Sequence, residues 1–126
     1  GTGSVLRRCT FSDNTAQLGG AALYGPAELE RCVLLQNVNG VAGGTVEGGA
    51  LLDRCTLVHN TPATGGATVL GSTLVSSIVW DNAVAQLGGG ASATYSCVQG
   101  GAAGVGNIAA DPLFIDLANE QVGLLM

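Results

Sequence analysis

The chain has 126 residues, a net charge of −5 and no lysine, and 47% of its residues are hydrophobic while only 10% are charged. This length restricts it to one domain, the negative charge argues against a nucleic-acid partner, and no apolar run is long enough for a membrane span. With one Trp, two Tyr and two Phe, its core must be built from small aliphatic side chains.

From its first residues the chain repeats one pattern. The stretch LRRCTFSDN (6–14) returns as LERCVLLQN (29–37) and as LDRCTLVHN (52–60). Four columns of residues share a period of 22–23: Leu6, Leu29, Leu52 and Leu74; Cys9, Cys32, Cys55 and Ser77; Asn14, Asn37, Asn60 and Asn82; and Gly20, Gly43, Gly66 and Gly89. Several columns with one period indicate a solenoid of stacked repeats.

Each repeat is expected to contain three short strands. In the first half of the second repeat, Leu29, Cys32 and Leu34 point inward, and Glu30-Arg31 marks a bend between two strands. The glycine-dense second halves predict a turn and a short strand at 21–23, 45–47 and 67–70. The sequence therefore predicts an all-β, right-handed parallel β-helix of about five coils over residues 1–100. Residues 101–126 are expected to form a degenerate last coil or C-terminal lap.

The alternative fold is a leucine-rich repeat. The first half of each unit, L-x-x-C-x-[FL]-x-x-N, fits that consensus closely. A leucine-rich repeat would need a helix or a further leucine-bearing segment in the second half, where each glycine would cost a helix about 1 kcal/mol. The β-helix is therefore the favoured fold.

The columns have structural explanations. Cysteine fills a tight corner as a small, buried and free thiol. Asparagine tolerates the left-handed conformation of a turn, and its amide can bond to its equivalent in the next coil to form a ladder. The glycine column would supply positive φ at another corner. Arg8, Arg31 and Arg54 are expected on the outside, with Glu30 and Asp53 close enough to offset their repulsion.

Two stretches resemble known β-helix proteins. The segment FSDNTAQLGGAAL (11–23) carries F-x-x-N and G-G-A-[ILV] elements and resembles the repeats of chlamydial polymorphic membrane proteins, although leucine replaces phenylalanine in the next two coils. Residues 76–116 are similar to the end of right-handed parallel β-helix proteins of bacterial surfaces. The resemblance implies an exported protein, extracellular or on the cell surface. Such proteins include adhesins, surface passengers and polysaccharide-active enzymes. The start at Gly1, without a signal peptide, suggests a processed or excised product.

Few residues suggest a chemical site, and neither a cofactor nor a metal is expected. Asp81 could approach His59 one coil away as an acid–base pair, or both could simply be polar residues of a solvated turn. Asp111 and Asp116 flank PLFI, where calcium is conceivable, but a structural lap is the favoured interpretation. Trp80, in an outward column, is the candidate for contact with a glycan.

The sequence thus predicts a non-enzymatic structural or adhesive module. The alternative is a carbohydrate-binding or carbohydrate-cleaving fragment of a β-helix. An open end of a β-helix exposes unpaired strand edges, so the chain is expected to stack on neighbouring coils of a longer parent chain or to associate end to end into filaments.

Overall fold

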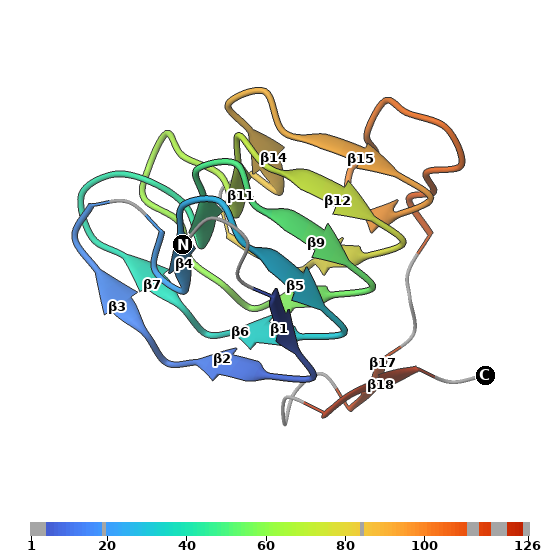
Figure 1. The fold of residues 1–126 in the computed structure, drawn as a ribbon, viewed down its shortest axis with the longest axis horizontal. Coiled ribbons are helices and arrows are strands. Elements are labelled where there is room, and N and C mark those ends of the chain that lie inside the picture. Colours follow the sequence, from blue (N-terminus) through green and yellow to red (C-terminus); the bar gives the residue numbers. More distant parts are fainter. Residues whose placement is uncertain (1–4, 19, 84, 111–113, 117–120, 125–126) are drawn as a thin grey trace.

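The computed structural model describes residues 5–18, 20–83, 85–110, 114–116 and 121–124. All regular elements in these ranges are β-strands, so the leucine-rich-repeat alternative is wrong. The chain winds through a parallel β-solenoid, which confirms the predicted fold, but the number of turns is about four rather than about five (Figure 1). No helix in the described ranges is long and apolar enough to cross a membrane.

Equivalent strands of successive coils pair in parallel and form four sheets. Sheet A contains β1 (Val5–Arg7), β5 (Glu28–Glu30), β9 (Leu51–Asp53), β12 (Thr73–Val75) and β15 (Ser92–Thr94). Sheet B contains β2 (Thr10–Ser12), β6 (Val33–Leu35), β10 (Thr56–Val58), β13 (Ile78–Trp80) and β16 (Cys97–Val98). Sheet C is short, with β3 (Thr15–Ala16) and β7 (Val38–Asn39). Sheet D contains β4 (Leu23–Tyr24), β8 (Val46–Glu47), β11 (Val69–Leu70) and β14 (Leu87–Gly88).

The middle residue of each three-residue strand fills the interior. Leu29, Leu52 and Leu74 stack in sheet A and are completely buried, and Leu34 and Leu57 do the same in sheet B. Burying each such side chain contributes about 1.5–3 kcal/mol. In the first coil the equivalent residues are only half-buried, since β1 and β2 each pair with a single neighbouring strand.

Two corners of the coil are made by non-glycine residues with positive φ, at equivalent places in successive coils. The first corner comprises Arg8, Arg31, Arg54, Ser76 and Tyr95, and the second comprises Asp13, Gln36, His59 and Asp81. The expectation that the asparagines themselves adopt the left-handed conformation is therefore corrected: the residue before each of them does. A left-handed residue costs roughly 1–2 kcal/mol, and its amide bonds to the next coil, as Arg31 N does to Asp53 O (2.9 Å).

The fourth coil is shorter than the others, and this corrects the predicted glycine column. Val46 pairs with Val69, but Val69 pairs with Leu87, a separation of only 18 residues (87 − 69). Because Leu70 pairs with Gly88, Gly89 lies in register with Gly71 and not with Gly66.

Glycine in the column of Gly20, Gly43 and Gly66 is explained mainly by close approach of the backbone. Only Gly43 among these three has a positive φ (99°). A Cβ atom at Gly66 would lie 2.5 Å from the Gly43 carbonyl oxygen, and one at Gly20 would overlap the Leu23 carbonyl. The predicted positive φ therefore does not hold for the whole column.

Residues 101–110 remain part of the coil stack. Val98 N donates to Ile108 O (3.0 Å) and Ile108 N donates to Ser96 O (2.9 Å), so this segment continues one side of the solenoid. Further on, β17 (Phe114–Asp116) and β18 (Gln121–Leu124) form an antiparallel pair. Asp111 lies outside the described residues and only the backbone of Asp116 is described, so the calcium hypothesis stays untested there.

Candidate functional site

The four repeated asparagines form one continuous ladder inside the solenoid. Asn14 Nδ2 donates to Asn37 Oδ1, Asn37 Nδ2 to Asn60 Oδ1, and Asn60 Nδ2 to Asn82 Oδ1, each at 2.9 Å. Backbone amides join the same acceptors, as Asn37 N does to Asn60 Oδ1 (3.0 Å). The asparagine amides also donate to backbone carbonyls of the preceding coil, as Asn60 Nδ2 does to Leu34 O at 2.9 Å. This arrangement is structural, because its atoms bond to one another across the coils.

Gln86 ends this ladder and could not be identified from the repeat. Asn82 Nδ2 donates to Gln86 Oε1 at 2.9 Å, where a fifth asparagine would otherwise stand. Gln86 lies in the irregular loop of the shortened fourth coil, outside the four columns. The sequence signals were a polar side chain four residues after Asn82 and the return of AQLGG (16–20) at 85–89.

A second ladder runs along the corner occupied by the cysteines. Cys55 N donates to Ser77 Oγ (3.0 Å), and Ser77 N to Ser96 Oγ (3.1 Å). Ser96 N in turn donates to Asn107 Oδ1 (3.0 Å), which closes the ladder. Ser96 and Asn107 were missed in the sequence, since their spacings of 19 and 11 residues break the period.

The thiols of this corner act as hydrogen-bond donors. Cys32 Sγ donates to Leu6 O (3.4 Å) and Cys55 Sγ to Leu29 O (3.3 Å). All four cysteines are thiols rather than disulfides; Cys32, Cys55 and Cys97 are buried, while Cys9, in the first coil, is half-buried. Desolvation by burial raises the pKa of the Cys55 thiol to about 12, so it stays protonated and unreactive near neutral pH.

The structure brings His59 and Asp81 together. His59 Nε2 lies 3.0 Å from Asp81 Oδ2, with the two side chains 24% and 51% exposed. Both are left-handed residues of the second corner, so the backbone stack itself places them one above the other. Among the described residues no group of three or more His, Cys, Asp and Glu side chains is arranged to hold a metal ion.

Trp80 lies in sheet B and is only half-exposed. It pairs with Val58, which is completely buried although its position has the outward phase. A half-exposed indole beside a buried valine offers a small accessible surface. The glycan contact proposed for Trp80 stays a prediction.

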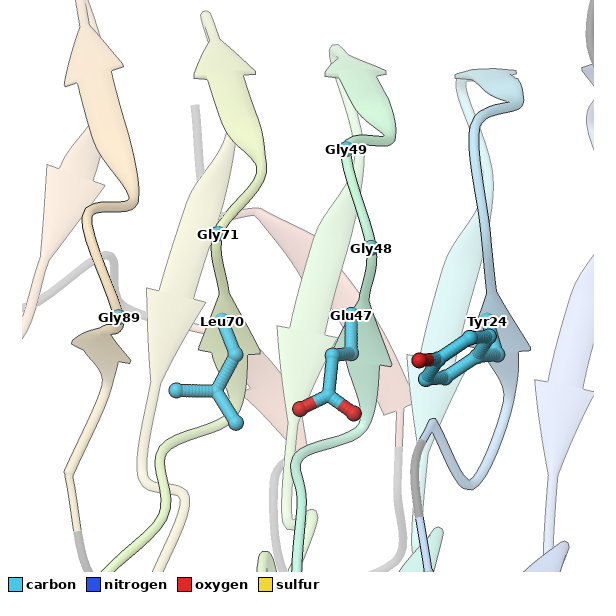
Figure 2. A pocket seen from close by; sticks show the side chains of 7 residues that line it. All are labelled: Tyr24, Glu47, Gly48, Gly49, Leu70, Gly71 and Gly89. Atoms are coloured by element: carbon cyan, nitrogen blue, oxygen red, sulfur yellow. The ribbon is translucent and has the colours of Figure 1, made fainter.

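A further candidate site lies on sheet D. An open groove of about 440 Å³ crosses this sheet and is lined by Tyr24, Glu47, Gly48, Gly49, Leu70, Gly71 and Gly89. Figure 2 shows Tyr24, Glu47 and Leu70 side by side on successive strands, with Gly48 and Gly49 following β8 and Gly71 following β11. The register places Tyr24 directly opposite Glu47, and Glu47 opposite Leu70.

The two polar side chains of this groove are free to meet a ligand. Tyr24 is 70% exposed, so both its ring and its hydroxyl group are accessible to a ligand. Neither Tyr24 nor Glu47 forms a side-chain hydrogen bond or ion pair with the described part of the chain. By contrast, Glu30 is engaged by Arg7 (3.3 Å) and Asp53 by Arg54 (3.4 Å). The groove was not found from the sequence, because its column carries four different residues.

Comparison with known proteins gives no assignment of family or function. No protein-family model, no curated protein and no solved structure matches the chain.

Proposed function

We propose that this chain is a non-enzymatic structural or adhesive β-helix module of an exported bacterial protein, acting outside the cell or on its surface. The observation that carries the proposal is the open groove on sheet D. It presents one free aromatic ring and one free carboxylate on a backbone that the two internal ladders hold in register. Such a surface suits binding.

The chemistry of the groove supports binding over cleavage. Hydrolysis of a glycosidic bond normally uses two carboxyl groups on either side of the bond. Glu47 is the single carboxylate among the residues that line the groove. The His59–Asp81 pair lies on another corner, after sheet B, and is not among the groove residues.

The alternative is a carbohydrate-binding or carbohydrate-cleaving fragment. Its binding form is favoured by Tyr24, since exposed aromatic rings offer a flat surface against which a sugar ring can stack. Its cleaving form would rest on His59 and Asp81. The relation to polymorphic-membrane-protein repeats remains part of the proposal and rests on the motifs of residues 11–23.

The test combines adhesion with an assay for cleavage. Beads coated with the folded protein should be retained on a layer of cultured cells under flow, and beads coated with an Asn37→Ala/Asn60→Ala variant that no longer folds should not. The soluble protein should release no reducing ends from a panel of polysaccharides. Release that disappears in His59→Ala would overturn the proposal in favour of an enzyme. Equal retention of both bead types would overturn the adhesive role.

A further inference from the structure

We propose that the groove on sheet D binds an oligosaccharide that carries amino groups, and that it rejects acidic polysaccharides. This inference rests on the proposed binding function and names the class of ligand. Shape, side-chain chemistry and charge distribution support it.

The shape of the groove suits an extended ligand. It crosses all four strands of sheet D, which at a spacing of about 4.8 Å extend over about 14 Å. The glycines keep it open: a Cβ atom at Gly49 would meet nothing within 4 Å, and one at Gly71 only the Gly89 carbonyl oxygen, at 3.4 Å. The space next to Gly49 and Gly71 is therefore open.

Part of the groove backbone is already hydrogen-bonded between coils. Gly25 N donates to Glu47 O (2.8 Å), Gly49 N to Gly71 O (3.1 Å) and Gly71 N to Gly88 O (3.1 Å). The polar side chains that line the groove are those of Tyr24 and Glu47. These two lie next to each other across one coil step, with the Tyr24 hydroxyl on the side of strand β8 (Figure 2).

Together the two side chains select a cation attached to a flat apolar surface. An ammonium group is attracted both by a carboxylate and by the face of a tyrosine ring. A sugar ring with an amino substituent supplies that cation together with a C–H face that can stack on Tyr24 and contact Leu70. A neutral sugar would have the stacking without the ion pair.

The distribution of charge argues against acidic polysaccharides as ligands of the groove. The chain has no lysine, and its four arginines, Arg7, Arg8, Arg31 and Arg54, lie at the end of sheet A strands and at the corner that follows, away from the groove residues. An acidic polysaccharide in this groove would bring its carboxylates to Glu47 with no nearby cation, on a chain of net charge −5. The groove is therefore unsuited to uronic acids.

The experiment compares tetrasaccharides built from glucosamine, from N-acetylglucosamine and from galacturonic acid. Each is titrated into the protein by calorimetry. We expect the glucosamine tetrasaccharide to bind most tightly, the neutral N-acetylated one more weakly and the galacturonate not at all. Added salt should weaken the first and leave the second unchanged. Galacturonate binding as tight as glucosamine binding, or no binding of the glucosamine tetrasaccharide, would overturn the inference.

Single substitutions test whether the oligosaccharide binds in the groove on sheet D. Glu47→Gln and Tyr24→Ala should each weaken glucosamine binding about 3- to 10-fold. Glu28→Gln removes an equal charge from sheet A, and Tyr95→Ala removes another exposed ring from a corner; both should bind like the parent. Because Glu47→Gln preserves size on an outward position, loss of folding is not expected. If Glu28→Gln weakens binding as much as Glu47→Gln, the assigned groove is wrong.

The outcomes separate this inference from the proposed function. Beads that adhere to cells while the protein binds no aminated oligosaccharide would overturn the ligand class and leave the adhesive module standing. Oligosaccharide binding together with bond cleavage would overturn the non-enzymatic proposal and leave the ligand class standing.

Discussion

Asn82 and Gln86 form a reciprocal pair that closes one end of the asparagine ladder. Asn82 Nδ2 donates to Gln86 Oε1 at 2.9 Å, and Gln86 Nε2 donates to the Asn82 carbonyl oxygen at 3.0 Å. At the other end, Asn14 donates to Asn37, but its own Oδ1 accepts no hydrogen bond within the described part of the chain. The two ends of the ladder are therefore unlike: among the described residues, only the end in the fourth coil is closed by a side chain of its own chain.

The ladder predicts a large effect of Asn37→Ala. The Asn37 side chain is completely buried, accepts from Asn14 and donates to both Phe11 O and Asn60 Oδ1. Its removal leaves buried groups without partners and should lower the free energy of unfolding by roughly 1–3 kcal/mol. Urea denaturation measures this, with Asn14→Ala in the exposed first coil as a milder control. A loss of a few tenths of a kcal/mol would contradict the ladder's contribution.

Closure by Gln86 predicts a smaller but definite effect. Gln86→Ala removes one of the two acceptors of Asn82 Nδ2 and leaves Leu57 O as the other, which should cost about 1 kcal/mol in the free energy of unfolding. Gln17→Ala removes the same side chain from an exposed loop position and serves as the matched control. Equal stability of the two variants, measured by urea denaturation, would show that water replaces Gln86 without loss.

The sequence predicted what the period governs and missed what lies outside it. Asn37 and Cys32 were found because a β-helix repeats their environment in every coil, so selection of one residue type becomes visible as a column. Gln86 and Asn107 end the ladders in irregular segments, where no period exists to reveal them. Gly89 was misassigned because the fourth coil lost residues between Val69 and Leu87. Tyr24 and Glu47 share a column whose side chains face solvent, so packing does not impose one residue type there.

Burial of the Cys55 thiol predicts a loss of stability at alkaline pH. Its pKa is raised from 9.0 to about 12 in the folded chain, chiefly through desolvation. Between these values the unfolded chain releases the proton and the folded chain retains it, so stability is complete below about pH 9 and declines as pH rises toward 12. Urea midpoints measured across this range should fall less steeply for Cys55→Ser, a residue that the same corner accepts at Ser77. Parallel curves would contradict this.

Unequal burial of the thiols predicts an order of alkylation. Cys9 is half-buried in the first coil, whereas Cys32 is buried and donates to Leu6 O. In the native protein, iodoacetamide should therefore modify Cys9 first, and Cys32 only after denaturation. Peptide mass spectrometry after timed labelling resolves the two sites. Modification of Cys32 at the rate of Cys9 would show that the corner opens in the native state.

The unlike ends predict where any end-to-end association would be blocked. The strands of the first coil have one neighbour each, so β1 offers an unpaired edge that another chain could extend. At the opposite end Gln86 and Asn107 close both ladders, and β14 and β15 also have one neighbouring strand each, so the two ends present unlike surfaces. Val5, 43% exposed on β1, lies at the open edge, and Val41, 67% exposed, lies on a lateral loop. Charges on an edge strand oppose pairing, so Val5→Lys should lower the average mass measured by light scattering at rising concentration, and Val41→Lys should not.

A parent protein that stays monomeric at 12.4 kDa throughout would rule out self-association, and equal effects of the two lysines would place the contact elsewhere.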